Sequence, residues 1–252
     1  MSAIEYIILI AAPLIGGIFS FWMRHKKDQN LRLMLAFSGS FLFATVILHL
    51  LPELYLQNKM TIAPWILLGF IIQLILELFT RGIEHGHLHS NKKHNHQDHI
   101  HSHTTEEHSS FYAASVLIGL SIHSFIEGLP LNTEFAAEEG HNSLFLGVVL
   151  HKIPAAFALM SIATVSKMKN GYLLVVAYAL MTPLGALCSH WMKNNNMENF
   201  MQYNDIFLAL AVGSFFHIST TILFESATKN HSITFFKFTA IIVGAALAFI
   251  TH

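Results

Sequence analysis

The chain has 252 residues, of which 53% are hydrophobic and only 12% are charged, and its formal net charge is −1. So little charge cannot cover the surface of a water-soluble domain of this length, and the balanced charge argues against nucleic-acid binding. The single cysteine, Cys188, excludes an intramolecular disulfide and a thiolate metal cluster.

Eight apolar runs follow one another along the chain. A bilayer core of about 30 Å needs roughly 20 helical residues to cross it, and each run is close to that length. The first run begins near Glu5 rather than a basic segment and has no small-residue cleavage site after it, so we interpret it as a retained helix. We therefore expect an all-α integral membrane protein with a single transmembrane domain over 1–252, its helices lying near residues 4–23, 31–54, 62–80, 111–131, 142–165, 171–192, 203–226 and 233–251.

The connection 81–110 is the one long loop between these runs, and its polar composition predicts disorder. It holds nine of the 18 histidines, several at alternate positions, and such imidazoles can chelate divalent metals without a fold. We expect this loop to capture metal ions; the alternative is a flexible linker whose histidines are incidental. The histidines are His85, His87, His89, His94, His96, His99, His101, His103 and His108.

Lysine and arginine placement predicts the orientation of the helices. If the N-terminus lies outside, the inside connections hold most of these residues, including the cluster from Arg24 to Arg32, whereas the outside connections hold Lys59 and Lys193. Both termini are then outside, and the histidine-rich loop faces the cytoplasm.

Ionisable side chains inside the apolar runs are costly, at about 2.5–3.5 kcal/mol or more each near the bilayer centre, and need partners or a water-filled path. His123 is roughly 18 Å from the inner end of its helix and His151 roughly 14 Å from the outer end of the next, so both lie at about the same depth. Glu127 follows His123 by four residues and shares its face. Together with His217, which is also near mid-depth, they form a set suited to zinc or iron. The alternative is a hydrogen-bond network between helices.

Other polar residues lie nearer the helix ends. We expect His49 and Glu53, near the outer end of the second run, to serve either metal entry or helix capping. Gln73, Glu77 and Glu225 are interpreted as anchors of helix ends. Small residues are expected to permit close helix approach, namely Gly119, Gly147, Gly185 and Gly213.

Four segments carry a family resemblance: HSFIEG, HKIPA, FSGSFLFATVILHLLPE and MTPLGA. With their order and spacing, the chain resembles the ZIP (Zrt/Irt-like) family of zinc and iron transporters over nearly its whole length, as a divergent bacterial member. The resemblance implies eight transmembrane helices in a 3+2+3 bundle, often as a homodimer, in the bacterial inner (cytoplasmic) membrane. It also implies two adjacent metal sites built from the fourth and fifth helices.

The chain departs from the family pattern at the second of these sites. Ser124 replaces an asparagine, Lys152 a glutamate, and Ala155 and Ala156 a histidine and a glutamate; Thr182 stands where some bacterial members have a glutamate. A lysine ammonium can stand in for a bound cation. The hypothesis is that Lys152 replaces the second metal; the alternative is a salt bridge to Glu127 or another buried carboxylate.

The sequence therefore predicts a divalent-metal transporter that moves Zn²⁺, or else Fe²⁺, Mn²⁺, Co²⁺ or Cd²⁺, toward the cytoplasm as its substrate. His123, Glu127, His151 and His217 are the predicted ligands; no organic cofactor and no enzymatic activity are expected, and the partners are metal ions and lipid. One alternative is a membrane metal sensor that does not transport. A metal-dependent intramembrane hydrolase is the weakest alternative, because Lys152 after His151 breaks an HExxH motif.

Overall fold

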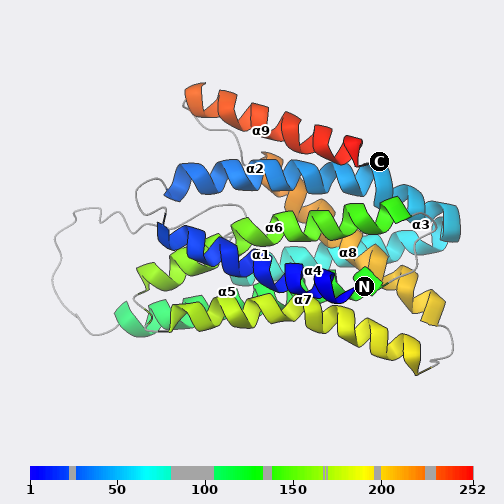
Figure 1. Ribbon diagram of the computed structural model, residues 1–252, viewed down its shortest axis with the longest axis horizontal. Coiled ribbons are helices and arrows are strands. Elements are labelled where there is room, and N and C mark those ends of the chain that lie inside the picture. Colours follow the sequence, from blue (N-terminus) through cyan, green and yellow to red (C-terminus); the bar gives the residue numbers. More distant parts are fainter. Residues whose placement is uncertain are drawn as a thin grey trace.

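The computed structural model describes residues 1–22, 27–80, 105–132, 138–166, 168, 170–195, 200–224 and 231–251, and these residues form helices and short turns without a strand (Figure 1). The histidine-rich segment 81–104, together with Glu225, lies outside the described residues. The helices are α1 (Ala3–Trp22), α2 (Lys27–Thr45), α3 (Leu51–Asn58), α4 (Ala63–Thr80), α5 (Thr105–Gly128), α6 (Glu138–Val165), α7 (Gly171–Asn194), α8 (Phe200–Phe224) and α9 (His231–Ile250).

The second long helix contains a local irregularity. A π-helical segment, η1 (Val46–Leu50), joins α2 to α3, so the three elements form one continuous rod. Pro52 lies two residues after this segment and cannot donate a backbone hydrogen bond to the preceding turn, which accounts for the change in helical pitch. Two 3₁₀ turns, η2 (Lys59–Ile62) and η4 (Leu129–Asn132), lead into α4 and follow α5.

The composition of the helices matches a lipid environment. Six described segments are long and apolar enough to cross a bilayer, whereas the described apolar parts of α4 and α9 are shorter. Large apolar side chains face outward, for example Ile7, Trp22 and Leu78, which are 64%, 80% and 73% exposed. Several ionisable side chains instead lie inside the bundle, among them His123, Glu127 and Lys152. This distribution confirms the expected class, an all-helical membrane protein.

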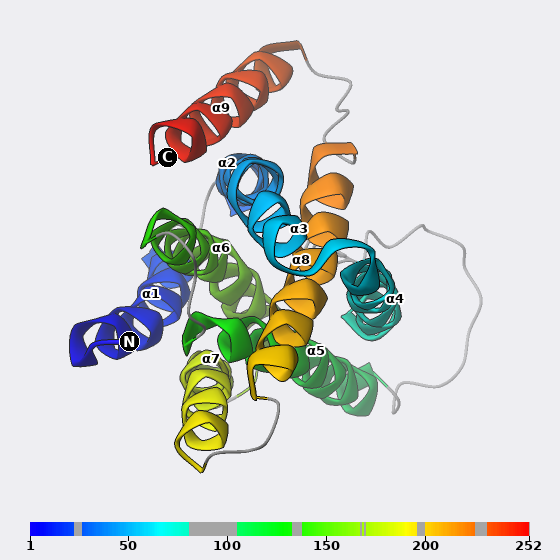
Figure 2. The same cartoon turned by 90° about the vertical axis from the view of Figure 1, so that its right-hand side faces the viewer.

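The helices pack in neighbouring pairs along one bundle. The closest partners are α2 with α9, α1 with α6, α4 with α8 and α5 with α7. The end view shows α9, α1 and α4 toward the periphery, outside α2, α6 and α8 respectively (Figure 2). Both ends of the chain lie at the same end of the bundle, near α3 (Figure 1). The 3+2+3 grouping of helices stays a prediction.

Glycines allow the backbones of α5 and α7 to touch. A Cβ atom added at Gly128 would overlap the carbonyl oxygen of Thr182, and one added at Gly185 would overlap that of Phe125. A Cβ at Gly16 of α1 would likewise overlap the carbonyl oxygen of Ile153 on α6. Each of these two pairs therefore packs at a separation that a side chain at the contact would prevent.

Candidate metal centre

Three potential metal ligands converge between α5 and α6. His123 and Glu127 lie one turn apart on α5, and His151 comes from the middle of α6. One nitrogen of each ring and one carboxylate oxygen lie within 4.8 Å of one another, and all three side chains are fully buried. Among the residues that the structure describes, no other group of three His, Cys, Asp or Glu side chains converges in this way.

The local geometry resembles a set of ligands that share one centre. The His123 Nε2 atom lies 2.7 Å from Glu127 Oε1. The His123 and His151 rings are perpendicular, with their centroids 5.9 Å apart. In tetrahedral zinc sites the metal–ligand bonds of about 2.0–2.1 Å place the ligand atoms roughly 3.3 Å apart. Small side-chain adjustments would therefore suffice for these atoms to surround one divalent ion.

Lys152 lies beside this group and is itself 1% exposed. Its Nζ atom is 2.6 Å from Glu127 Oε2 and donates a hydrogen bond of 2.6 Å to Ser124 Oγ. The ammonium also lies 4.9 Å from the centre of the Tyr178 ring. One carboxylate oxygen of Glu127 thus faces the histidines while the other faces the lysine, so the salt-bridge alternative to a replaced metal is present in the structure.

The structure also places the other residues at which the chain departs from the expected motifs. Thr182 on α7 donates a hydrogen bond of 3.1 Å to the carbonyl oxygen of Ser124 and so ties α7 to the centre. Ala155 and Ala156, one turn beyond Lys152 on α6, are buried in a hydrophobic cluster with Leu120. Neither alanine offers a ligand atom, so this part of α6 is apolar.

The second nitrogen of His123 is held by a pair of residues that sequence reasoning missed. Nδ1 lies 3.0 Å from Ser214 Oγ on α8, and Ser214 donates a hydrogen bond of 3.1 Å to Gln73 Oε1 on α4. Gln73 is only 1% exposed, so its interpretation as an anchor of a helix end was wrong. A usable signal was present, since a glutamine in an apolar helix needs a buried polar partner.

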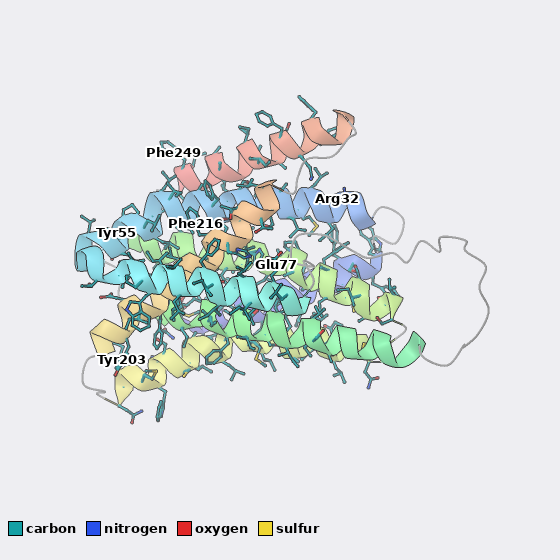
Figure 3. All side chains as sticks on the ribbon, turned by 180° about the vertical axis from the view of Figure 1, so that it is seen from behind. Arg32, Tyr55, Glu77, Tyr203, Phe216 and Phe249 are labelled. Atoms are coloured by element: carbon teal, nitrogen blue, oxygen red, sulfur yellow. The ribbon has the colours of Figure 1, made fainter. Side chains whose placement is uncertain are left out.

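His217 lies on α8 near this pair but is not part of the converging group. Its Nε2 atom is 2.5 Å from Glu77 Oε2, and its ring meets the edge of Phe70 at a centroid separation of 4.8 Å. His217 and Glu77 are 7% and 20% exposed. Glu77 lies between the bundle end marked by Tyr55 and Tyr203 and the end toward Arg32 (Figure 3).

The remaining candidates lie away from the centre. His49, in η1, is buried, and its Nε2 atom is 3.1 Å from the carbonyl oxygen of Ala248 on α9. Glu53 is buried on α3 and close enough to Asp205 on α8 for their charges to interact. Of the loop histidines, only His108 belongs to a described helix, α5, and its side chain lies outside the described part.

Comparison with known proteins adds one finding to this geometry. A family model described as ZIP Zinc transporter matches residues 1–252, which is the whole chain. Comparison with curated protein sequences gives no match.

Proposed function

Because the chain belongs to the ZIP zinc transporter family, we propose that it carries Zn²⁺ toward the cytoplasm through a site made by His123, Glu127 and His151. Membership in the family confirms the resemblance carried by the motifs, and it makes the chain a multi-pass membrane metal transporter. Zinc as the preferred ion, inward direction and these three ligands are the proposal. Fe²⁺, Mn²⁺, Co²⁺ and Cd²⁺ are the competing substrates.

The observation that carries the proposal is the convergence of three buried donors from two helices. Two imidazoles and one carboxylate can replace the water that a divalent ion loses when it enters the bundle. These groups would otherwise be expensive to keep in a dry, apolar interior. A hydrolase remains the weakest alternative, because members of this family are transporters.

Lys152 sets the charge of this site. Its ammonium neutralises Glu127, so the group of ligands has no net negative charge when both histidines are neutral. A divalent ion bound there keeps most of its charge uncompensated, which weakens binding. Transport needs an ion to be held firmly enough to enter and loosely enough to leave. In this proposal, Lys152 supplies permanently the positive charge that a second metal supplies elsewhere in the family.

The same contact favours a second candidate function. With Nζ at 2.6 Å from Glu127 Oε2, an ion that approaches the histidines must share the carboxylate with a fixed cation. A chain in which that competition prevents passage would bind metal and report its level without moving it.

Uptake of radioactive zinc into proteoliposomes tests the proposal. The wild type is expected to show saturable uptake that His151→Ala abolishes. The matched control is His190→Ala, because His190 is an exposed histidine bonded to Asn194 of the same helix. Zinc binding at the buried centre without uptake by the wild type would support the sensor instead. Equal uptake by wild type and His151→Ala would reject the proposed site.

The segment 81–110 is proposed to gather ions at the cytoplasmic face. Its deletion is expected to lower the zinc that the protein retains at equilibrium while leaving the buried centre able to bind. Isothermal titration of the full and shortened chains measures the difference. The same number of bound ions in both chains would show that the loop histidines do not capture zinc.

A further inference from the structure

The contacts around His123 extend beyond the three proposed ligands. Its Nδ1 atom faces Ser214 Oγ at 3.0 Å, and Ser214 donates to Gln73 Oε1 at 3.1 Å. A carbonyl oxygen such as Gln73 Oε1 can only accept a hydrogen bond. The single hydroxyl proton of Ser214 is therefore directed at Gln73, and Ser214 Oγ has only its lone pairs to offer to His123.

This direction fixes the role of each nitrogen in the ring. Since Ser214 Oγ acts as the acceptor, His123 Nδ1 must carry a proton and donate it. A neutral imidazole with its proton on Nδ1 presents a lone pair at Nε2. Nε2 is the nitrogen that faces Glu127 Oε1, at 2.7 Å, and so the one directed into the group of ligands. Two lone pairs at this separation repel, so a proton or a metal ion must lie between Nε2 and the carboxylate oxygen.

We infer that Ser214 and Gln73 form a relay that positions His123 as a metal ligand through Nε2. Neither residue touches the ion in this account, so both are positioning residues rather than ligands. Hydrogen bonds of this kind fix the tautomer and orientation of a metal-binding histidine, and their loss typically lowers metal affinity about tenfold to a hundredfold. The inference rests on the proposed function for the role of His123 as a ligand and for the identity of the ion.

The packing of α4 against α8 brings the two relay residues together. A Cβ atom added at Gly69 would overlap the carbonyl oxygen of Leu210, and one added at Gly213 would overlap that of Ile66. The backbones of the two helices are therefore in contact one turn away from Gln73. Gln73 follows Gly69 by four residues and Ser214 follows Gly213 by one, so this contact sets the distance that their side chains span.

All members of the relay are buried, so a broken hydrogen bond within it cannot be replaced by one to water. His123 and Glu127 are 0% exposed, Gln73 is 1% exposed and Ser214 is 3% exposed. A buried donor that loses its acceptor costs about 1–3 kcal/mol. With Ser214 removed, the proton on Nδ1 has no acceptor in the relay, and the ring is better satisfied with its proton on Nε2, donated to Glu127. A metal ion that binds Nε2 would then force the proton back onto Nδ1, where it has no acceptor in the relay.

Substitutions at Ser214 separate the hydroxyl from its volume. Ser214→Thr keeps the hydroxyl. Ser214→Val gives a side chain of the same shape as threonine but without the hydroxyl. Nitrogen-15 spectra of the histidine rings in the full-length protein, with His123 assigned by its absence in His123→Ala, report the protonated nitrogen without added metal. Titration with Zn²⁺ alone then gives the occupancy of His123 separately from the loop histidines.

The relay predicts a proton on Nδ1 of His123 in the wild type and in Ser214→Thr, and its absence in Ser214→Val, where the ring keeps only the proton that Nε2 donates to Glu127. Zinc affinity at His123 is expected to fall about tenfold to a hundredfold in Ser214→Val and to be rescued in Ser214→Thr. Ser219→Ala is the matched control, because Ser219 is buried on the same helix and bonds only to the carbonyl oxygen of Phe216 in the contacts described.

Gln73→Leu frees the Ser214 hydroxyl to donate to Nδ1, and so it is expected to move the proton in the same direction. Because Gln73 acts through Ser214, adding Gln73→Leu to Ser214→Val should produce no further change in the tautomer. An unprotonated Nδ1 in the wild type, or equal losses in Ser214→Thr and Ser214→Val, would overturn the relay. Absence of zinc uptake would reject the permease and leave the tautomer result standing.

Discussion

Two of the histidine–carboxylate pairs in the bundle have the same chemistry and differ in their burial and in their neighbours. His123 and Glu127 are both fully buried, with His151 and Lys152 against them. His217 and Glu77 join α8 to α4. The histidine is buried and the glutamate is 20% exposed, and they belong to no group of three ligands in the described part of the chain. A buried histidine beside a glutamate is thus insufficient evidence for a metal site; a third converging donor makes the difference.

Substitutions in the two pairs are expected to differ most in their effect on folding stability. In Glu127→Ala the Lys152 ammonium remains buried without its counter-charge, and breaking such a pair typically lowers the free energy of unfolding by about 3–5 kcal/mol. Glu77→Ala leaves the buried His217 without this hydrogen bond and should lower the free energy of unfolding by only about 1–3 kcal/mol. Unfolding by SDS in mixed micelles measures both.

A double substitution provides the control for this first prediction. Glu127→Leu with Lys152→Met removes both charges and should recover much of the stability lost in Glu127→Ala. If Glu127→Ala proved no more harmful than Glu77→Ala, the buried ion pair would not be holding the centre together.

The second-largest difference is expected in zinc affinity. His151→Ala removes a proposed ligand and should weaken zinc binding at His123 by more than the tenfold to hundredfold typical of an outer contact. His217→Ala should leave that affinity within about twofold, because His217 contacts Glu77 rather than the central ligands. Titration followed through the His123 ring resonances gives both values. A similar loss in the two variants would place His217 in the site after all.

The last prediction, and the only one that expects a gain in affinity, concerns Lys152. In Lys152→Met a divalent ion no longer meets a fixed positive charge; two unit charges about 4 Å apart interact by about 4 kcal/mol at an effective dielectric of 20. Much of this is offset by lost packing and hydration, so we expect zinc affinity to rise about tenfold. Equilibrium dialysis compares the variant with Lys193→Met, which alters a lysine at the end of α7. Unchanged affinity would mean that the ammonium does not compete with the ion.

The sequence predicted best those features that depend only on position along a helix axis. The lengths of the apolar runs predicted the helical membrane class, and residue counts from helix ends placed His123 and His151 at one depth. The four-residue spacing put Glu127 on the face of His123. The alternative in which Lys152 pairs with Glu127 was also derived from the sequence, because a buried ammonium needs a counter-charge.

The partners of His123 depended on how each helix is rotated about its axis and on which helices are neighbours. A single sequence does not encode either directly. Counting residues locates a side chain only to about one turn, since helix ends are uncertain and helices tilt. Ser214 and His217 are three residues apart on α8, about 4.5 Å along its axis, and it is Ser214 that meets His123. Nothing in the spacing within α4 reveals that Gln73 will face α8 at this level.

The glycine contacts have a mechanical consequence for the centre. Gly128 and Gly185 bring α5 against α7, while Gly16 brings α1 against α6, so each pair is tightly coupled along its contact. His123 and Glu127 travel with the first pair and His151 with the second. Sliding one pair past the other would alter the separation of the two imidazoles and spare the spacing within α5. The ligands of the proposed site thus come from two packed pairs of helices, so a small displacement between the pairs would change the geometry of the site without unfolding a turn.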